Sequence, residues 1–257
     1  MHGSNRDKEP SAMGWMSHLS GCMGRCQSSG VGYANGSWGY TVLRTAYSAE
    51  ADAIWATALG KLRRWVTQYF IHQNRLIHNK PDSSVNEEVA RRFILEVFED
   101  PNSEKLKLPD IAKASQDDIT PLTDVFEAWV HNAVGNVDFD PADNPRFCNF
   151  LVIDEGSLRS LVALPDETPS LELVSREERR ARSKLWSHAY VWLVDSPAAR
   201  RFQGVNGGDN YNGWMKLNPS DLPAAWFERV ARFEDETWIF GRREIPEGSG
   251  DLWYHQR

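Results

Sequence analysis

A strand-like segment followed by a long amphipathic helix opens the patterned part of the chain. The segment from Tyr40 to Tyr47 is dense in β-branched and aromatic residues, which is typical of a strand. Ser48 is a preferred helix-capping residue, and the acidic side chains that follow it favour the positive end of a helix dipole. Apolar residues then recur at three- and four-residue spacing, which predicts a buried helix face made of Ile54, Trp55, Ala58, Leu59, Leu62, Trp65, Val66 and Tyr69.

Two further helical patterns follow this first helix. Val89, Phe93, Ile94, Val97 and Phe98 predict a second helix that stops at the Asp-Pro-Asn sequence of residues 100–102. Thr120 and Pro121 then predict the start of a third helix, with an apolar stripe that ends before residue 135. We therefore expect a helical insert over about residues 80–135.

The second half of the sequence contains short apolar runs that predict strands. Residues 147–153 and 189–194 are nearly continuous apolar runs, which suit strands covered on both faces. A short strand is expected at 214–217, a helix opened by Asn218 and Pro219, and a last strand at 237–240. Residues 176–186 predict a charged helix, and the residues from Glu244 onward are expected to pack loosely.

Without the insert, the order of elements is βαββαβ, which predicts an α+β fold of the ferredoxin-like class. Such a core has an antiparallel sheet with helices on one face. Because the predicted strands are apolar on both sides, the second face must also be covered. Two alternatives remain open: the helical insert covers that face, or a second subunit does so in a homodimer.

The chain divides into a polar tail and one domain. Residues 1–37 are rich in Gly, Ser, Met and Asn without a sustained period, so we expect a disordered tail, with a single domain over 38–257. Cys22 and Cys26 lie in this tail without the companion pair that a zinc site needs. No apolar signal segment and no apolar stretch of about 18 residues occurs, so a soluble cytoplasmic protein that does not enter the membrane is expected.

Charge and motifs narrow the classes of function. The net charge of −7 argues against nucleic acid as a partner, because phosphate binding needs cations. The arginines at 176, 179, 180 and 182 alternate with Glu177 and Glu178, which predicts a solvated mixed-charge helix. No nucleotide-binding or hydrolase motif is present, and neither a metal nor a cofactor is expected.

Arg44 is the leading candidate for a binding residue. Period-two alternation directs it to the same face as Val42 and Ala46, and a buried cation must be paired or bind an anion. Acidic residues that follow the apolar strands are its candidate partners: Asp154, Glu155 and Asp195. The alternative is an anion-binding pocket formed by Arg44, Tyr47 and Lys216, with Trp214 beside it.

His188 and Asp195 are the candidate catalytic residues. His188 directly precedes a predicted buried strand, where a pocket at the sheet rim would make it a general base. Asp195 ends that strand, and with Asp154 it could form an acid–base pair, although strand-end aspartates usually form turns.

The sequence resembles a family of largely uncharacterised filamentous-fungal proteins. The resemblance covers about residues 38–240 and is carried by the W-G-Y-T-V-L-R-T-A-Y opening at 38–47, Trp55, the Ile-Asp-Glu at 153–155 and the G-W-M-K segment at 213–216. It implies a fungal source and relatives among genes of specialised metabolism. Residues 165–169 depart from the usual shape of the family, and no catalytic role is carried over.

Two hypotheses about function follow from these observations. The first is an enzyme or accessory protein of fungal secondary metabolism that acts on a hydrophobic small molecule, with isomerisation or cyclisation as the reaction type. The second is a non-catalytic protein-interaction module, which a solvent-facing tryptophan patch would favour.

Overall fold

The computed structural model describes residues 37–78, 83–134, 145–169, 175–203, 210–231, 240–246 and 248–255. The expected disordered tail, with Cys22 and Cys26, lies outside these ranges except for Ser37, as does most of the strand expected at 237–240. Within them the order of helices and strands is β1 (Trp38–Arg44), α2 (Ala49–His78), α3 (Ser83–Arg91), β2 (Phe93–Phe98), η2 (Glu104–Leu106), η3 (Ile111–Lys113), α4 (Gln116–Val134), η5 (Pro145–Phe147), β3 (Asn149–Ile153), α5 (Glu155–Val162), α6 (Arg176–Ser183), β4 (Val191–Asp195), α7 (Ser196–Arg201), β5 (Trp214–Leu217), η6 (Pro219–Asp221), α8 (Leu222–Ala231), β6 (Arg242–Glu244) and β7 (Leu252–Tyr254).

One mixed sheet organises the described residues. Its seven strands have the order β2-β1-β3-β4-β5-β7-β6. β1 is parallel to both β2 and β3, β4 is antiparallel to β3 and β5, and β7 is parallel to β5. The α+β class is therefore consistent with the structure, whereas the ferredoxin-like antiparallel sheet is replaced by a larger mixed one.

The difference from the predicted topology begins at residues 93–98. The sequence pattern predicted a helix there, but α3 ends at Arg91 and β2 begins at Phe93. The residues that form β2 are mostly β-branched, aromatic or leucine, and such side chains satisfy helical spacing and strand propensity equally well. The parallel β1–β2 pair requires a crossover connection, which α2 and α3 supply.

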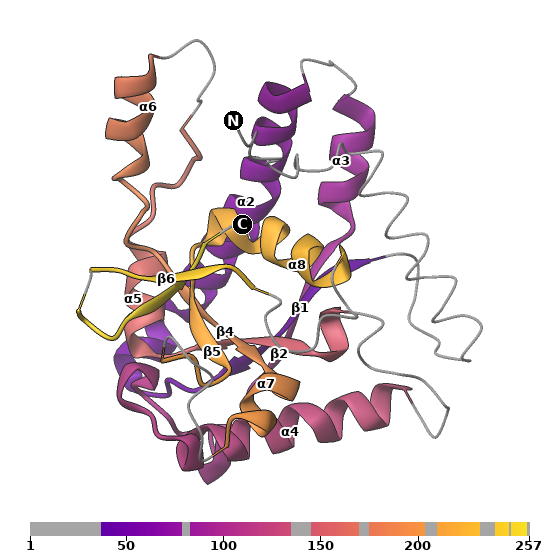
Figure 1. Cartoon of the computed structure of the whole chain (residues 1–257), viewed down its shortest axis with the longest axis vertical. Helices are drawn as coiled ribbons and strands as arrows, with labels where there is room; N and C mark the ends of the chain where they lie inside the picture. The colour runs from indigo at the N-terminus through magenta and orange to yellow at the C-terminus, as the bar shows by residue number, and fades with distance from the viewer. Residues whose placement is uncertain are drawn as a thin grey trace, which may run out of the picture.

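Helices cover both faces of this sheet, so the molecule has three layers (Figure 1). One buried cluster joins the sheet to α2, α5 and α8, and a second joins the opposite face to α4. The helical insert thus covers the second face through α4, which decides between the two alternatives left open by the sequence. No second subunit is needed to bury the apolar strands.

Several local predictions are confirmed. The Ser48 Oγ accepts a hydrogen bond from the Ala51 amide at 3.1 Å, at the start of α2. Asn218 likewise caps η6 by accepting from the Ser220 amide at 3.0 Å. β3, β4 and β5 fall within or beside the predicted ranges, and β3 and β4 are buried throughout.

The prediction of a loosely packed C-terminus is wrong. β6 and β7 form an antiparallel ribbon that extends the sheet beyond β5. Leu252 and Tyr254 are buried in the α2-side cluster, and the Tyr254 hydroxyl donates to the Glu228 carboxylate at 2.9 Å. The two strands are short, and β6 consists of charged residues, so no strand pattern is evident in the sequence here. The apolar contacts of the ribbon arise because β7 pairs with the edge of the sheet at β5.

Candidate functional site

The carboxyl ends of β1 and β3 mark the place where open α/β sheets usually bind ligands. The chain leaves β1 through α2 on one face, and after β2 it returns through α4 on the other face to β3. The neighbours of β1 in the sheet are β2 and β3, and the helices that connect to them, α2 and α4, lie on opposite faces of the sheet. This arrangement defines a topological switch point beside β1. β5 is parallel to β3 through the antiparallel β4, so its carboxyl end lies at the same edge of the sheet.

Arg44 lies at this edge and forms a structural ion-pair cluster. It is the last residue of β1 and is only 7% exposed. Its Nη1 donates to Glu99 Oε2 at 3.0 Å, its Nη2 to Asp52, and its Nε to the Ala46 carbonyl at 2.8 Å. The guanidinium also stacks on Trp55, 4.7 Å from the ring centroid. All three of its nitrogens are thus occupied, two by carboxylates and one by a backbone carbonyl, and neither carboxylate is one of those proposed from the sequence.

Tyr47 supports the same cluster. The Arg44 guanidinium lies 4.8 Å from the centroid of its ring, and the Tyr47 hydroxyl donates to the Arg44 carbonyl at 2.9 Å. The same hydroxyl accepts from the Asp100 amide at 2.9 Å, which ties β1 to the segment after β2. Burial raises the pKa of Tyr47, so its hydroxyl stays protonated at neutral pH.

The pocket that combined Arg44, Tyr47 and Lys216 is not assembled. Arg44 shares a face of β1 with Val42 and stacks on Trp55, both in the α2-side cluster. Lys216 pairs in register with Trp192, which belongs to the α4-side cluster. The two cations therefore occupy opposite faces of the sheet, and the proposed anion site is separated into two environments.

His188 and Asp195 also lie apart. His188 is exposed in the turn before β4, between the buried residues Trp186 and Ala189, whereas Asp195 is buried at the other end of β4. Asp195 Oδ1 caps α7 by accepting from the Ala198 amide at 2.9 Å. The length of β4 separates the two, and the geometry gives no support to a shared catalytic role.

Asp154 and Asp195 do not form an acid–base pair either. Asp195 is opposite Asn149 at the first residue of β3, while Asp154 follows the last residue of β3. Five residue steps along a strand correspond to about 16 Å. The antiparallel direction of β4, which the sequence did not fix, places the two strand-end aspartates at opposite edges.

Lys216 is the centre of a compact polar and aromatic cluster at the carboxyl edge, which we call the Lys216 cluster: Tyr190, Trp192, Lys216, Asp251 and Trp253. The Lys216 ammonium lies 4.7 Å from the ring centroid of Tyr190, 5.3 Å from that of Trp192 and 5.7 Å from that of Trp253. It pairs with Asp251 Oδ2 at 3.1 Å. Both the rings and the carboxylate stabilise the charge of this largely buried lysine.

Strand register explains why these residues meet. Trp192 on β4, Lys216 on β5 and Trp253 on β7 are lateral neighbours, and their side chains point to the same face of the sheet. Trp214, two residues before Lys216 on β5, projects to that face as well and packs against the α4-side cluster. Of the predicted substrate-binding residues, the structure brings Trp214 and Lys216 to one surface.

Tyr190 is half-buried at the rim of this cluster. Its hydroxyl lies over Gly156 in the first turn of α5, where a Cβ would come within 2.5 Å of the hydroxyl oxygen. Burial raises the pKa of Tyr190, and the carboxylates of Asp154, Asp110 and Asp251 raise it further. The phenol is therefore held in its protonated form at neutral pH and can act as a hydrogen-bond donor.

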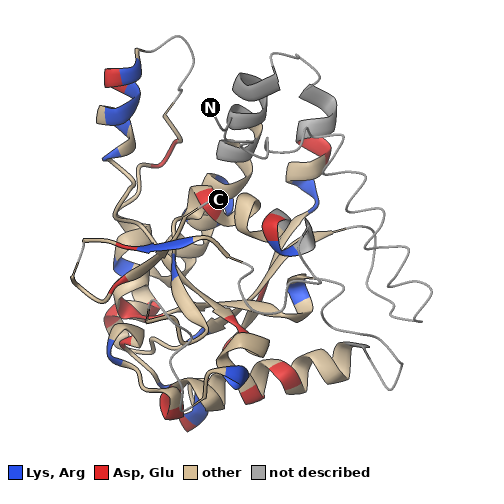
Figure 2. Cartoon of the chain, in the orientation of Figure 1, with Lys and Arg blue, Asp and Glu red and all other residues tan. Residues whose placement is uncertain are grey.

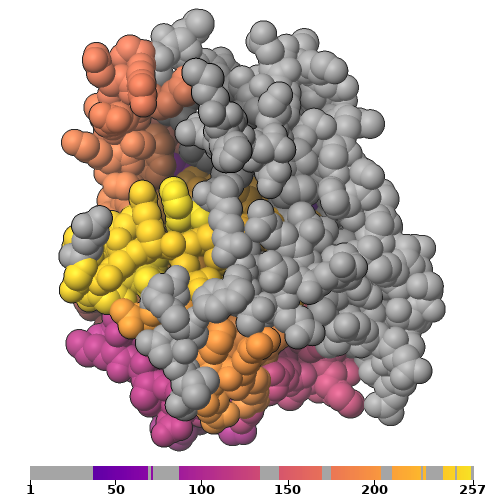
Figure 3. Space-filling model, in the orientation of Figure 1, coloured from indigo at the N-terminus to yellow at the C-terminus, as the bar shows by residue number. Residues whose placement is uncertain are grey.

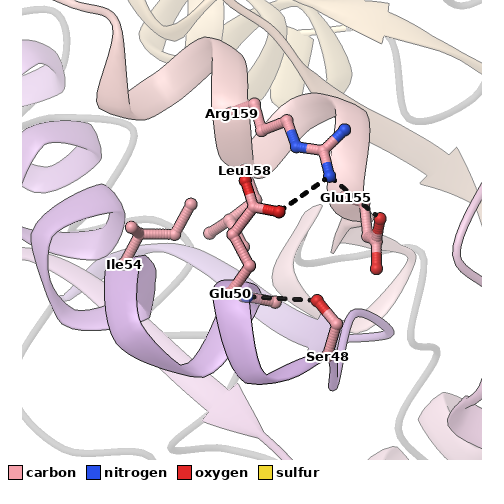
Figure 4. A pocket seen from close by; sticks show the side chains of 7 residues that line it. Ser48, Glu50, Ile54, Glu155, Leu158 and Arg159 are labelled. Carbon is pink, nitrogen blue, oxygen red and sulfur yellow. Dashed lines mark hydrogen bonds and ion pairs between the residues drawn. The ribbon is translucent and has the colours of Figure 1, made fainter.

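A shallow hollow lies on the α2 side of the same edge, between the first turns of α2 and α5 (Figure 4). Its empty volume of about 150 Å³ includes open solvent, and almost none of that space would hold even a water molecule, so the hollow is not a ligand pocket. Arg159 lies across it, with its Nη2 3.3 Å from Glu50 Oε2 and 3.4 Å from Glu155 Oε2. Since these carboxylates already balance the arginine, the hollow offers no unpaired charge to an anion.

Tyr190, Asp251 and Trp253 were not predicted as site residues from the sequence. The alternation of residues 189–194 contained a usable signal, because it directs Tyr190 and Trp192 to one face. No sequence pattern indicated that Asp251 and Trp253 belong to this cluster, because they lie near Lys216 only through the pairing of β7 with β5.

Metal and membrane sites are not evident in the described ranges. Their His, Cys, Asp and Glu side chains form no group of three or more that could hold a metal ion. None of the helices in the described residues is long and apolar enough to cross a membrane.

The fold and site define a three-layer protein with a mixed sheet and a lysine-centred aromatic cluster at its carboxyl edge. Comparison with known proteins found no matching family model, no matching curated protein and no matching solved structure.

Proposed function

We propose that this protein binds a hydrophobic small molecule at the Lys216 cluster, as a cytoplasmic enzyme or accessory protein of fungal specialised metabolism. The observation that carries the proposal is the juxtaposition of two proton donors, Lys216 and Tyr190, with partly exposed aromatic rings. The fungal and metabolic context rests on the sequence resemblance described above.

The chemistry of the cluster suits isomerisation or cyclisation. The Lys216 side chain and the Tyr190 phenol can donate to one oxygen of a substrate and polarise its carbonyl group. The partly exposed rings of Tyr190, Trp253 and Trp214 provide apolar surface for the rest of the molecule. Both reaction types rearrange atoms within one substrate, and so they need no redox cofactor.

Metabolite profiling of a strain that lacks the gene tests the proposal directly. We expect a missing or altered hydrophobic metabolite, restored by the natural sequence but not by Lys216→Met, and restored at reduced level by Tyr190→Phe. Lys105→Met is the matched control, because Lys105 is exposed in η2 and should complement fully. An unchanged profile in the deletion strain, or full complementation by a folded Lys216→Met protein, would contradict the proposal.

The tryptophan patch expected of an interaction module is not seen in the described residues. Their large hydrophobic side chains with high exposure are Leu185 and Ile245, and no tryptophan is among them. This form of the second hypothesis therefore has no support from the geometry.

A further inference from the structure

α6 projects from the rest of the molecule at the upper left of Figure 1, and its side chains extend into solvent in Figure 3. None of its residues is buried. Its local support is a cap, in which the Ser175 Oγ accepts from the Glu178 amide at 3.1 Å, and one ion pair between Glu178 and Arg182. A short polar helix with so little support makes no contribution to the core, so its composition must be explained by something other than packing.

Helical geometry separates the charges that alternate in the sequence. At about 100° per residue, Arg176, Arg179, Arg180 and Lys184 fall within an arc of about 140°. Glu178 and Arg182 pair on the other side of the helix. We call the four cations on the shared arc the α6 basic face. The solvated mixed-charge helix expected from the sequence is thus found, with no acidic residue within this arc and Glu177 at its edge, about 20° beyond Lys184.

The α6 basic face has no counter-ion within the part of the chain that the structure describes. The ion pairs found there include Arg182 but none of the four cations of this face. Figure 2 shows that cations predominate on α6, which also carries acidic residues in its first turn, and that further acidic residues lie on α4 and α5. Guanidinium groups arrayed in this way are well suited to bidentate contacts with carboxylates.

The rest of the chain is strongly acidic. Residues 176–184 carry five cations and two anions, a net charge of +3, so a total of −7 leaves −10 on the remaining residues. A partner that extends beyond α6, such as duplex nucleic acid or an anionic membrane, would meet this negative charge. A short acidic segment would not, because it can be confined to the helix, which is about 12 Å long.

An exposed apolar residue follows α6 in the chain. Leu185 follows Lys184, is 54% exposed and is one of two exposed large hydrophobic residues in the described ranges. Arginine combined with an exposed apolar side chain is typical of protein–protein interfaces, in which lysine and acidic residues are depleted. The combination therefore favours a protein segment over a purely anionic polymer.

We infer that α6 is a docking surface for an acidic segment of a partner protein, with carboxylates on the α6 basic face and an apolar side chain against Leu185. This interaction is independent of the small-molecule function proposed for the Lys216 cluster. It gives the protein-interaction hypothesis a specific surface.

Fluorescence polarisation with the full chain tests this inference. The probe is a labelled peptide of repeated Glu-Glu-Leu-Glu, compared with the same peptide carrying Lys in place of Glu. We expect the acidic peptide to bind and Arg179→Glu combined with Arg180→Glu to weaken it roughly tenfold or more, because two attractive contacts become repulsive. Leu185→Ser should weaken it several-fold without any change of charge.

The matched control reverses the same amount of charge elsewhere. Arg63 and Lys105 are exposed on α2 and η2, and Arg63→Glu with Lys105→Glu should leave affinity within about twofold. Equal weakening by both double variants would show a net-charge effect and overturn the inference. Tighter binding to duplex DNA or to phosphatidylserine vesicles than to the peptide, or dimerisation that the α6 variants abolish, would overturn it as well.

Discussion

At the scale of single residues, the Asp154 carboxylate has a structural role, because it accepts hydrogen bonds from several elements of the fold. Its Oδ1 caps α5 by accepting from the Ser157 amide at 2.8 Å, and its Oδ2 accepts from the Ile111 amide at 3.0 Å and from Trp192 Nε1 at 2.9 Å. It is 1% exposed, so these donors replace water entirely. One carboxylate therefore joins β3, α5, the η3 segment and β4.

Asp154→Asn should lower the free energy of unfolding by about 2–4 kcal/mol, because an amide nitrogen would face backbone and indole donors in a buried site. Urea denaturation followed by far-UV circular dichroism measures the change. Asp110→Asn is the control: Asp110 caps η3 by accepting from the Ala112 amide and is half-exposed, so a loss under about 1 kcal/mol is expected. Equal losses for both variants would show that Asp154 is an ordinary cap.

The environment of Arg44 could be predicted from the sequence only in part. Its burial and its need for a partner followed from strand alternation, and both are found. Its partners did not follow, because Asp52 lies one helical turn into α2 and Glu99 lies just beyond β2, a strand that the sequence pattern did not reveal.

At the scale of elements, the β1–β2 pair is the decisive feature that the pattern concealed. The two strands are in register from Trp38–Phe93 to Leu43–Phe98. They approach closely at Gly39, whose φ of +136° lies in the left-handed half of the Ramachandran plot that L residues avoid. A Cβ at this position would lie 1.9 Å from the Ile94 carbonyl oxygen, so glycine is required for the pair to form.

Gly39→Ala should destabilise the protein by more than about 3 kcal/mol, or prevent it from folding, because both the backbone angle and the neighbouring strand oppose a methyl group. Gly60→Ala provides the opposite control. Gly60 lies inside α2, and a Cβ there meets no atom within 4 Å. Alanine at this position should therefore stabilise the protein by about 0.5–1 kcal/mol in thermal or urea denaturation. A neutral Gly39→Ala variant would contradict the observed pairing.

At the scale of the whole molecule, the C-terminal ribbon and the first strand share one interior. Tyr40 of β1 and Tyr254 of β7 are both buried in the α2-side cluster, with α8 nearby: the Tyr40 hydroxyl donates to the Leu222 carbonyl and that of Tyr254 to Glu228. Burial raises the pKa of both phenols above the ordinary value of 10.0, and for Tyr254 the Glu228 carboxylate raises it further.

This burial predicts a loss of stability at alkaline pH. The unfolded chain releases these phenol protons near pH 10 while the folded chain keeps them, so their stabilising effect is complete below pH 10 and decreases as pH rises above it. Tyr254→Phe should reduce the slope of the unfolding free energy against pH by up to about 1.4 kcal/mol per pH unit above pH 10. Urea titrations between pH 8 and about 11.5 measure the slope.

Tyr47 serves as the control for this experiment. It is only partly buried and its hydroxyl lies beside Arg44, so Tyr47→Phe should change the slope less than Tyr254→Phe does. If Tyr254→Phe left the slope unchanged, the ribbon would not be seated in the core under these conditions.

The sequence by itself determined that a strand precedes the first helix, although β1 begins at Trp38 and not at Tyr40, and it determined the long α2 with its buried stripe, the runs that became β3 and β4, and the caps at Ser48 and Asn218. These features depend on side-chain period and on hydrogen bonds between near neighbours, which are local properties. Tertiary structure alone decided that 93–98 is a strand, that α4 covers the second face, and that Lys216 meets Tyr190, Trp192 and Trp253. Those outcomes depend on strand order and direction, and residues far apart in the chain carry no local pattern that records which strands will pair.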